Sequence, residues 1–177
     1  TYQTFASGGV FAKYSHEFQT LTDIGEDTVY YNADRSVVLN EEVLNDEVLA
    51  ELGVKREELQ SAKAAEVGNI FTLKTKYSAP LGLEFMDQDG TKKPVLMGCY
   101  GIGISRVMGV IAEKYADDKG LVWPEQVAPY KYYLISIGEA GTKKAEEFYV
   151  GHEGDVLYDD RDLRPGEKFA NADLIGL

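Results

Sequence analysis

The feature that most constrains this chain is a glycine-rich turn in residues 97–106, which read Met-Gly-Cys-Tyr-Gly-Ile-Gly-Ile-Ser-Arg. The pattern predicts a strand that leads through the turn into an amphipathic helix, because apolar residues recur at helical spacing from Ile104 to Tyr115. Glycine lets the backbone approach a ligand closely, and the first turn of a helix offers free N–H groups to an anion. Arg106 lies in that first turn, off the apolar stripe. A guanidinium in this position can form bidentate contacts with the oxygens of a phosphate.

Two common phosphate-binding loops do not fit this turn. A Walker A loop requires Gly-Lys-Ser or Gly-Lys-Thr, which does not follow here. The spacing Gly-x-x-Gly-x-Gly, between strands that we expect to be antiparallel, also differs from the dinucleotide-binding fingerprint. A simpler interpretation is a turn that only permits tight packing, and the spacing alone leaves both interpretations open.

Composition excludes several other classes of protein. The 177 residues suffice for one domain or for parts of two, and no apolar run approaches the roughly 20 residues that span a bilayer. The net charge of −12 argues against general nucleic-acid binding, although it leaves room for a local basic patch, and it favours solubility. The single cysteine excludes a disulfide framework and a Cys-rich zinc site, so we expect a reducing compartment and a cytoplasmic location, with no membrane partner.

The first 124 residues are expected to form an α+β domain with an antiparallel sheet. Strands are predicted at residues 18–22, 28–31 and 69–75, and a hairpin at 81–86 and 93–99. Asn40 is expected to cap a helix that Gly53 ends, and a second short helix is expected at 55–65.

The remaining residues, 125–177, are expected to form an incomplete α/β domain. Residues 121–129 carry two prolines and read as a linker between the domains. A strand at 132–137, a helix at 142–149, a strand at 155–158 and a helix after Pro165 then alternate in the manner of an α/β unit.

The glycine-rich turn resembles motif 3 of class II aminoacyl-tRNA synthetases, here at residues 97–116, and its string resembles that of bacterial-type prolyl-tRNA synthetases. Four further stretches resemble the same family in the same order, so the resemblance covers nearly the whole chain. They are residues 14–18 with 25–28, 67–71 with 75–78, 119–124 with 128–129, and 159–176.

This resemblance implies ATP-dependent activation of L-proline, followed by its transfer to tRNA(Pro). The proline carboxylate would attack the α-phosphate of ATP and pyrophosphate would leave, a step that needs charge neutralisation and positioning. Mg²⁺ is expected on the phosphates, with no protein residue assigned as its ligand. The implied fold is part of the class II antiparallel sheet with flanking helices, followed by part of an anticodon-binding domain, and the implied full-length protein is a homodimer.

The resemblance also implies roles for individual residues. Arg106 is expected to bind the triphosphate and to be the catalytic residue. The other expected contacts are to ATP, from Gln19, Thr75, Gly101 and Gly103, and to proline, from His16, Phe18 and Cys99. For His16 the alternative is a histidine that is simply hydrogen-bonded in the sheet, and for Cys99 it is a buried apolar cysteine. We assign no nucleophilic role to Cys99.

Several family features are missing from this sequence. Motifs 1 and 2 are not found, and the pattern of the second domain ends early, so the chain alone is not expected to be a competent enzyme. Residues 33–66, expected to be a mostly helical connector, replace the large editing insertion of many bacterial relatives. The alternative is a non-catalytic paralogue that binds tRNA or a partner protein, but retention of Arg106 and the glycine turn favours the enzyme.

Overall fold

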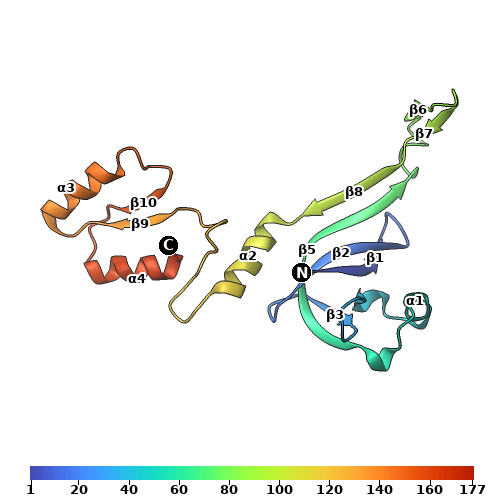
Figure 1. Cartoon of the computed structure of the whole chain (residues 1–177), viewed down its shortest axis with the longest axis horizontal. Coiled ribbons are helices and arrows are strands. Elements are labelled where there is room, and N and C mark those ends of the chain that lie inside the picture. The colour runs from blue at the N-terminus through green and yellow to red at the C-terminus, as the bar shows by residue number, and fades with distance from the viewer. The chain divides into compact units, whose positions relative to one another are not determined.

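A six-stranded sheet organises residues 1–110 in the computed structural model, which describes all 177 residues (Figure 1). The strands lie in the order β2-β1-β4-β3-β5-β8, and every pairing except that of β1 with β4 is antiparallel. Their bounds are β1 Tyr2–Ser7, β2 Tyr14–Leu21, β3 Asp27–Tyr31, β4 Val38–Asn40, β5 Gln60–Lys74 and β8 Met97–Ile102. The expectation of an antiparallel sheet in this part of the chain is therefore confirmed.

The long strand β5 connects the parts of this sheet. Its residues 60–64 pair with β3, residues 64–70 with β2, and residues 68–74 with β8. Because β2 pairs with both β1 and β5, the strands β2, β1, β4, β3 and β5 close into a ring. Figure 1 shows β5 as a long, curved ribbon that continues beyond this ring, where β8 lies against it.

The turn between β2 and β3 passes directly against β5. Leu21 at the end of β2 and Asp27 at the start of β3 both pair with Ala64 of β5. Gly25 lies between them, and a Cβ atom added there would come within 2.2 Å of the carbonyl carbon of Ala64. Glycine is therefore required at this position by the close approach of two backbones.

Two apolar clusters stabilise this unit. One consists of Val29, Val38 and Ala64, from three neighbouring strands. The other consists of Leu39, Val43, Val48 and Leu49, with Phe5, Tyr14 and Tyr30 packed against it. Val48 and Leu49 belong to α1, Asp46–Leu52, so the second cluster attaches this helix to the sheet.

The connector at residues 33–66 contains less helix than expected. Asn40 does act as a cap, but of the 3₁₀ turn η1, Glu41–Val43, while α1 has its own cap in Asn45 and ends at Gly53, whose φ is 68°. The prediction of a helix at 55–65 is wrong. Only the 3₁₀ turn η2, Arg56–Glu58, forms there, and β5 begins at Gln60, because pairing with β3 outweighs the helical propensity of this alanine-containing segment.

The predicted hairpin around residues 87–90 is present, with a shorter second arm than expected. It consists of β6, Glu84–Met86, and β7, Lys92–Pro94. Pro94 has no N–H to extend the pairing, and the separate strand β8 begins at Met97. The predicted helix follows as α2, Ile104–Tyr115.

Residues 111–177 form a second compact unit. Its elements are β9 Tyr132–Ile135, α3 Gly138–Tyr149, β10 Val156–Asp159 and α4 Pro165–Ile175, and β9 pairs in parallel with β10. The alternation expected from the sequence is therefore confirmed. The division at Val110 and Ile111 lies within α2, and the domain boundary expected at residues 124–125 stays a prediction.

A buried carboxylate anchors the second unit. Asp159 accepts hydrogen bonds from Nε and Nη2 of Arg161, each at 2.7 Å, and from the hydroxyl of Tyr133 at 2.8 Å. The Arg161 guanidinium holds the pKa of this carboxyl well below its usual range. Lys168, also buried, donates from Nζ to the backbone carbonyl of Asp159. None of the helices in either unit has the length and apolar character needed to cross a membrane.

Replacing Gly25 by alanine should destabilise the first unit by about 3 kcal/mol, because the added methyl group forces the backbones of the turn and of β5 apart. Gly109 is the matched control. It lies within α2 with open space around it, so Gly109→Ala should stabilise by about 0.5–1 kcal/mol. Chemical denaturation of both variants measures the difference, and equal effects would contradict the close approach.

Candidate functional site

Backbone hydrogen bonds fix the glycine-rich turn between β8 and α2. The N–H of Gly103 donates to the carbonyl of Val67 in β5 at 3.0 Å, and the Gly103 carbonyl accepts from the N–H of Val107 at 2.8 Å. Gly103 therefore ties the start of the helix to the sheet. A Cβ atom on Gly101 or Gly103 would meet its nearest neighbours at 3.5 and 3.4 Å, so neither glycine is strictly required by packing.

The closest packing involves Gly68, on the neighbouring strand. A Cβ atom there would lie 2.8 Å from the carbonyl oxygen of Gly101. This close packing requires a glycine on the partner strand, whereas the tight-packing interpretation of the turn itself is not confirmed, because a Cβ atom on its own glycines would make ordinary contacts. At Gly101 and Gly103 the absent side chains instead leave the backbone exposed.

Arg106 is anchored and yet accessible. Its Nη1 donates to the backbone carbonyl of Glu66 at 2.9 Å, and its side chain remains 44% exposed. Two longer ion pairs surround it, from Nη2 to Glu26 Oε2 at 3.5 Å and from Nη1 to Glu66 Oε2 at 3.6 Å. Since the guanidinium carries five N–H donors, most remain available to an anion.

The carboxylates around Arg106 are residues that the sequence analysis did not single out. Glu66 is further held by Asn69, whose Nδ2 donates to Glu66 Oε1 at 3.0 Å. The side chain of Glu26 is 81% exposed, so it can move aside when an anion binds. Nothing in the sequence pointed to Glu66, which was expected in the mostly helical connector 33–66 and lies instead on β5.

The register of β2, β5 and β8 divides the predicted residues between two faces of the sheet. Directly paired residues point to the same face, and the face alternates along each strand. Glu17 pairs with Asn69, which pairs with Gly101, and Phe71 pairs with Cys99. A register shift after Phe18 pairs Gln19 with Glu66, so the Glu66 carboxylate also lies on this side, which we call the Glu66 face.

The opposite side, which we call the His16 face, carries two of the three residues predicted to bind proline. His16 pairs with Ile70, which pairs with Tyr100, and Phe18 pairs with Gly68. The structure therefore does not bring His16 and Phe18 together with Cys99. His16 is exposed and lies edge-on to Phe5 at 5.8 Å, and Cys99 is exposed rather than buried.

The residues predicted to bind ATP are also separated. Gly101, Gly103 and Arg106 lie together at the turn. Thr75 follows the far end of β5, nine residues beyond Glu66, or roughly 30 Å along an extended strand.

Gln19, also predicted to bind ATP, is fully buried beneath the site. Its Nε2 donates to Glu17 Oε2 at 3.0 Å and to Asp27 Oδ2 at 2.5 Å, while its Oε1 has no partner. Gln19 therefore links two carboxylates within the protein and is not exposed for a contact with ATP.

The electrostatics of this network centre on Glu17. Burial raises the pKa of the Glu17 carboxyl, and the charges of Glu66 and Glu42 act in the same direction. Hydrogen bonds from Gln19 and from Asn40, whose Nδ2 lies 3.1 Å from Glu17 Oε2, oppose the shift. The cluster is thus held together by amide donors and contains no basic side chain hydrogen-bonded to Glu17.

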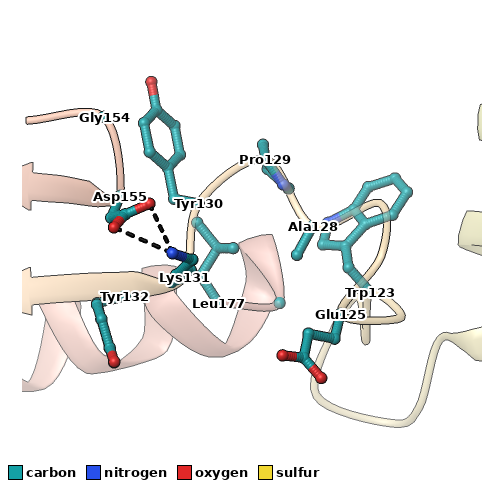
Figure 2. A pocket seen from close by; sticks show the side chains of 11 residues that line it. Trp123, Glu125, Ala128, Pro129, Tyr130, Lys131, Tyr132, Gly154, Asp155 and Leu177 are labelled. Atoms are coloured by element: carbon teal, nitrogen blue, oxygen red, sulfur yellow. Dashed lines mark hydrogen bonds and ion pairs between the residues drawn. The ribbon is translucent and has the colours of Figure 1, made fainter.

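The site contains no cluster of metal ligands, and sizeable cavities lie in the second unit instead. The structure contains no group of three or more His, Cys, Asp or Glu side chains arranged to hold a metal ion. A cavity of about 530 Å³ occurs in the second unit, where Lys131 forms an ion pair with Asp155 at 3.0 Å (Figure 2). None of the residues predicted for the site lines that cavity.

Comparison with known proteins provides independent information about this arrangement. Residues 3–115 match the family model described as the tRNA synthetase class II core domain (G, H, P, S and T). A protein named proline–tRNA ligase from Ehrlichia chaffeensis is 36% identical over 187 residues, which are 97% of this chain and 44% of that protein. Its counterpart from Wolbachia pipientis wMel is 39% identical over 183 residues, 97% of this chain and 43% of that protein. The chain thus spans less than half the length of these relatives.

Solved structures show the same fold. A crystal structure of prolyl-tRNA synthetase from Cryptosporidium parvum, complexed with L-proline and AMP, has a TM-score of 0.60 and 20% identity. The match covers 99% of this chain and 31% of that one. A second structure of that protein, complexed with halofuginone and AMPPNP, matches equally well.

Glu17→Gln should stabilise the chain at pH 7. An acid whose pKa is higher in the folded than in the unfolded chain opposes folding once it ionises, and this effect disappears below the unfolded value, near 4.5. A glutamine keeps an oxygen for both amide donors. Thermal unfolding should therefore give the variant a higher Tm at pH 7 and no advantage at pH 4. Glu57→Gln, at an exposed position, is the control, and a Glu17→Gln advantage that persists at pH 4 would contradict the burial argument.

Proposed function

Because the chain belongs to the class II tRNA synthetases, we propose that the full-length protein activates L-proline with ATP and transfers it to tRNA(Pro). The observation that carries the proposal is the geometry of Arg106, a half-exposed guanidinium at the start of α2, beside backbone that two glycines leave open. The choice of proline is supported by the relatives named proline–tRNA ligase, which align with 97% of the chain. A non-catalytic tRNA-binding paralogue is less well supported, because it would not need this arrangement.

In the proposed reaction the proline carboxylate attacks the α-phosphate of ATP and pyrophosphate leaves. Arg106 would bind phosphate oxygens of the triphosphate and offset the charge that develops as pyrophosphate departs. Its bond to the Glu66 carbonyl holds the guanidinium in place before the nucleotide arrives, so little reorganisation is needed. The triphosphate would replace the long contact with Glu26.

Mg²⁺ would supply further neutralisation of the phosphates when bound. Glu66 and Glu26 would hold it, since Mg²⁺ commonly takes one or two carboxylates together with phosphate oxygens and keeps several waters.

We place the proline pocket on the Glu66 face, where Cys99 lies opposite Phe71. Cys99 would form part of the wall of the pocket and has no histidine beside it on that face to activate it as a nucleophile. The predicted contributions of His16 and Phe18 would then be indirect, because both lie on the His16 face.

The second unit would contribute to tRNA binding as part of an anticodon-binding domain. Its parallel α/β arrangement and its inclusion in the alignments with the relatives support this assignment. Dimerisation and a cytoplasmic location remain parts of the proposal that rest on the family.

Arg106→Ala in the full-length protein should lower proline-dependent ATP–pyrophosphate exchange by about 10²-fold, as the loss of one charge contact to a transition state typically does. Arg56→Ala, which removes an exposed arginine in η2, is the matched control and should leave exchange unchanged. Exchange of the Arg106 variant within threefold of wild type would remove Arg106 from this role.

Cys99→Ala should raise KM for proline while kcat remains measurable, because the change enlarges the pocket without removing a reacting group. Discrimination against alanine should weaken, since one methylene-sized contact is worth about 1–3 kcal/mol. Proline titrations at saturating ATP measure both constants. Loss of kcat at unchanged KM would show that Cys99 is not part of the pocket wall.

A further inference from the structure

The loop between β3 and β4 holds Arg35 in a backbone conformation that calls for an explanation. Arg35 has a φ of 57°, a region that residues other than glycine adopt infrequently. Such conformations persist only where the surrounding structure fixes them, and they are concentrated at ligand-binding sites. Arg35 has no part in the chemistry described above.

Hydrogen bonds within the loop fix this conformation. The N–H of Arg35 donates to the carbonyl of Asn32 at 2.9 Å, and Asn32 Oδ1 accepts from the N–H of Val37 at 3.0 Å. Asp34 Oδ1 accepts from both the N–H and the hydroxyl of Ser36, at 3.0 and 2.8 Å, and these bonds lower the pKa of Asp34. The carboxylate of the neighbouring Asp34 is therefore bonded to Ser36, and Arg35 forms no ion pair.

Two tyrosines position the Arg35 side chain instead. Its guanidinium carbon lies 5.3 Å from the ring centre of Tyr2 and 5.4 Å from that of Tyr31, within the range of cation–π attraction. Nη1 also donates to the hydroxyl of Tyr2. The cation is thus oriented by neutral groups, and most of its N–H donors remain free for an anion.

Arg35 lines a cavity of about 370 Å³ on the first unit. Its wall includes Tyr2, Phe5, His16, Ser36 and Leu52, and it contains no Asp or Glu. Three other cavities of the molecule each include at least two carboxylates. In a chain with a net charge of −12, a cavity that has an unpaired arginine and no carboxylate favours an anionic ligand.

We propose that this cavity, which we call the Arg35 cavity, binds one nucleotide unit of an RNA strand. The phosphodiester would contact Arg35, and its base or ribose would pack on the wall formed by Tyr2, Phe5 and Leu52. One cation matches the single charge of a phosphodiester, whereas a free phosphate or nucleotide carries more charge and calls for further donors. The proposal rests on the proposed function, which gives the protein an RNA substrate.

The test compares matched variants of the full-length protein in binding to a tRNA(Pro) transcript. Arg35→Gly removes the charge and keeps the loop conformation, because glycine adopts a positive φ readily. Arg35→Lys keeps the charge without the planar fork, and Arg56→Gly removes an exposed arginine outside the cavity. Affinity is measured over a series of salt concentrations, and proline-dependent ATP–pyrophosphate exchange, which needs no RNA, is measured alongside.

Arg35→Gly should weaken binding of the transcript by about tenfold at low salt and reduce the slope of log affinity against log salt by about 1. Arg35→Lys should fall between wild type and Arg35→Gly, and Arg56→Gly should match wild type. Exchange should be unchanged in all three variants.

Two results would overturn the proposal. One is that Arg35→Gly binds RNA as tightly as wild type, or loses no more affinity than Arg56→Gly. An equal loss in the two variants would mean that only the overall charge of the protein matters. The other is Arg35-dependent binding of inorganic phosphate or AMP that is tighter than binding of the transcript, which would identify a free phosphate ligand. Absence of exchange in the wild type would defeat the proposed function separately, since the RNA measurement does not depend on it.

Discussion

The pairing of β5 with three neighbouring strands is the constraint on which the rest of the structure depends. Its first third closes the ring with β3, its middle pairs with β2, and its last part supports β8. Two glycines make this possible, because Gly25 lets a turn pass against Ala64 and Gly68 lets the carbonyl of Gly101 come close. The Glu66 carbonyl that holds Arg106 belongs to the same strand. The position of the guanidinium is therefore determined by β5 as much as by its own helix.

The register of these strands also separates two kinds of surface. On the Glu66 face, carboxylates, amides and Cys99 accompany Arg106, and a buried glutamine links Glu17 with Asp27. His16 points to the other face and lines the Arg35 cavity. Phosphate chemistry and the proposed RNA contact would thus use different arginines. Arg106 is held by a backbone carbonyl and two carboxylates, and Arg35 is held by two tyrosines.

Short-range sequence patterns correctly predicted the elements that are determined by neighbouring residues. The glycine turn and the apolar spacing of 104–115 predicted α2, Gly53 marked a helix end, and alternation predicted the order of elements in the second unit. The length of β5 was missed, because residues 55–65 resemble a helix unless their pairing with β3 is known. The burial of Gln19 and the opposite faces of His16 and Cys99 depend on register between distant strands, where a shift of one residue reverses every side chain.

The central claim is that the Arg106 site activates proline, and amino-acid-dependent ATP–pyrophosphate exchange by the full-length protein tests it most directly. The family model to which residues 3–115 match includes synthetases for five amino acids, denoted G, H, P, S and T, so the assay compares glycine, histidine, proline, serine and threonine. The account predicts exchange with proline and only background with the other four. Exchange that depends on one of those four amino acids, with none on proline, would contradict it.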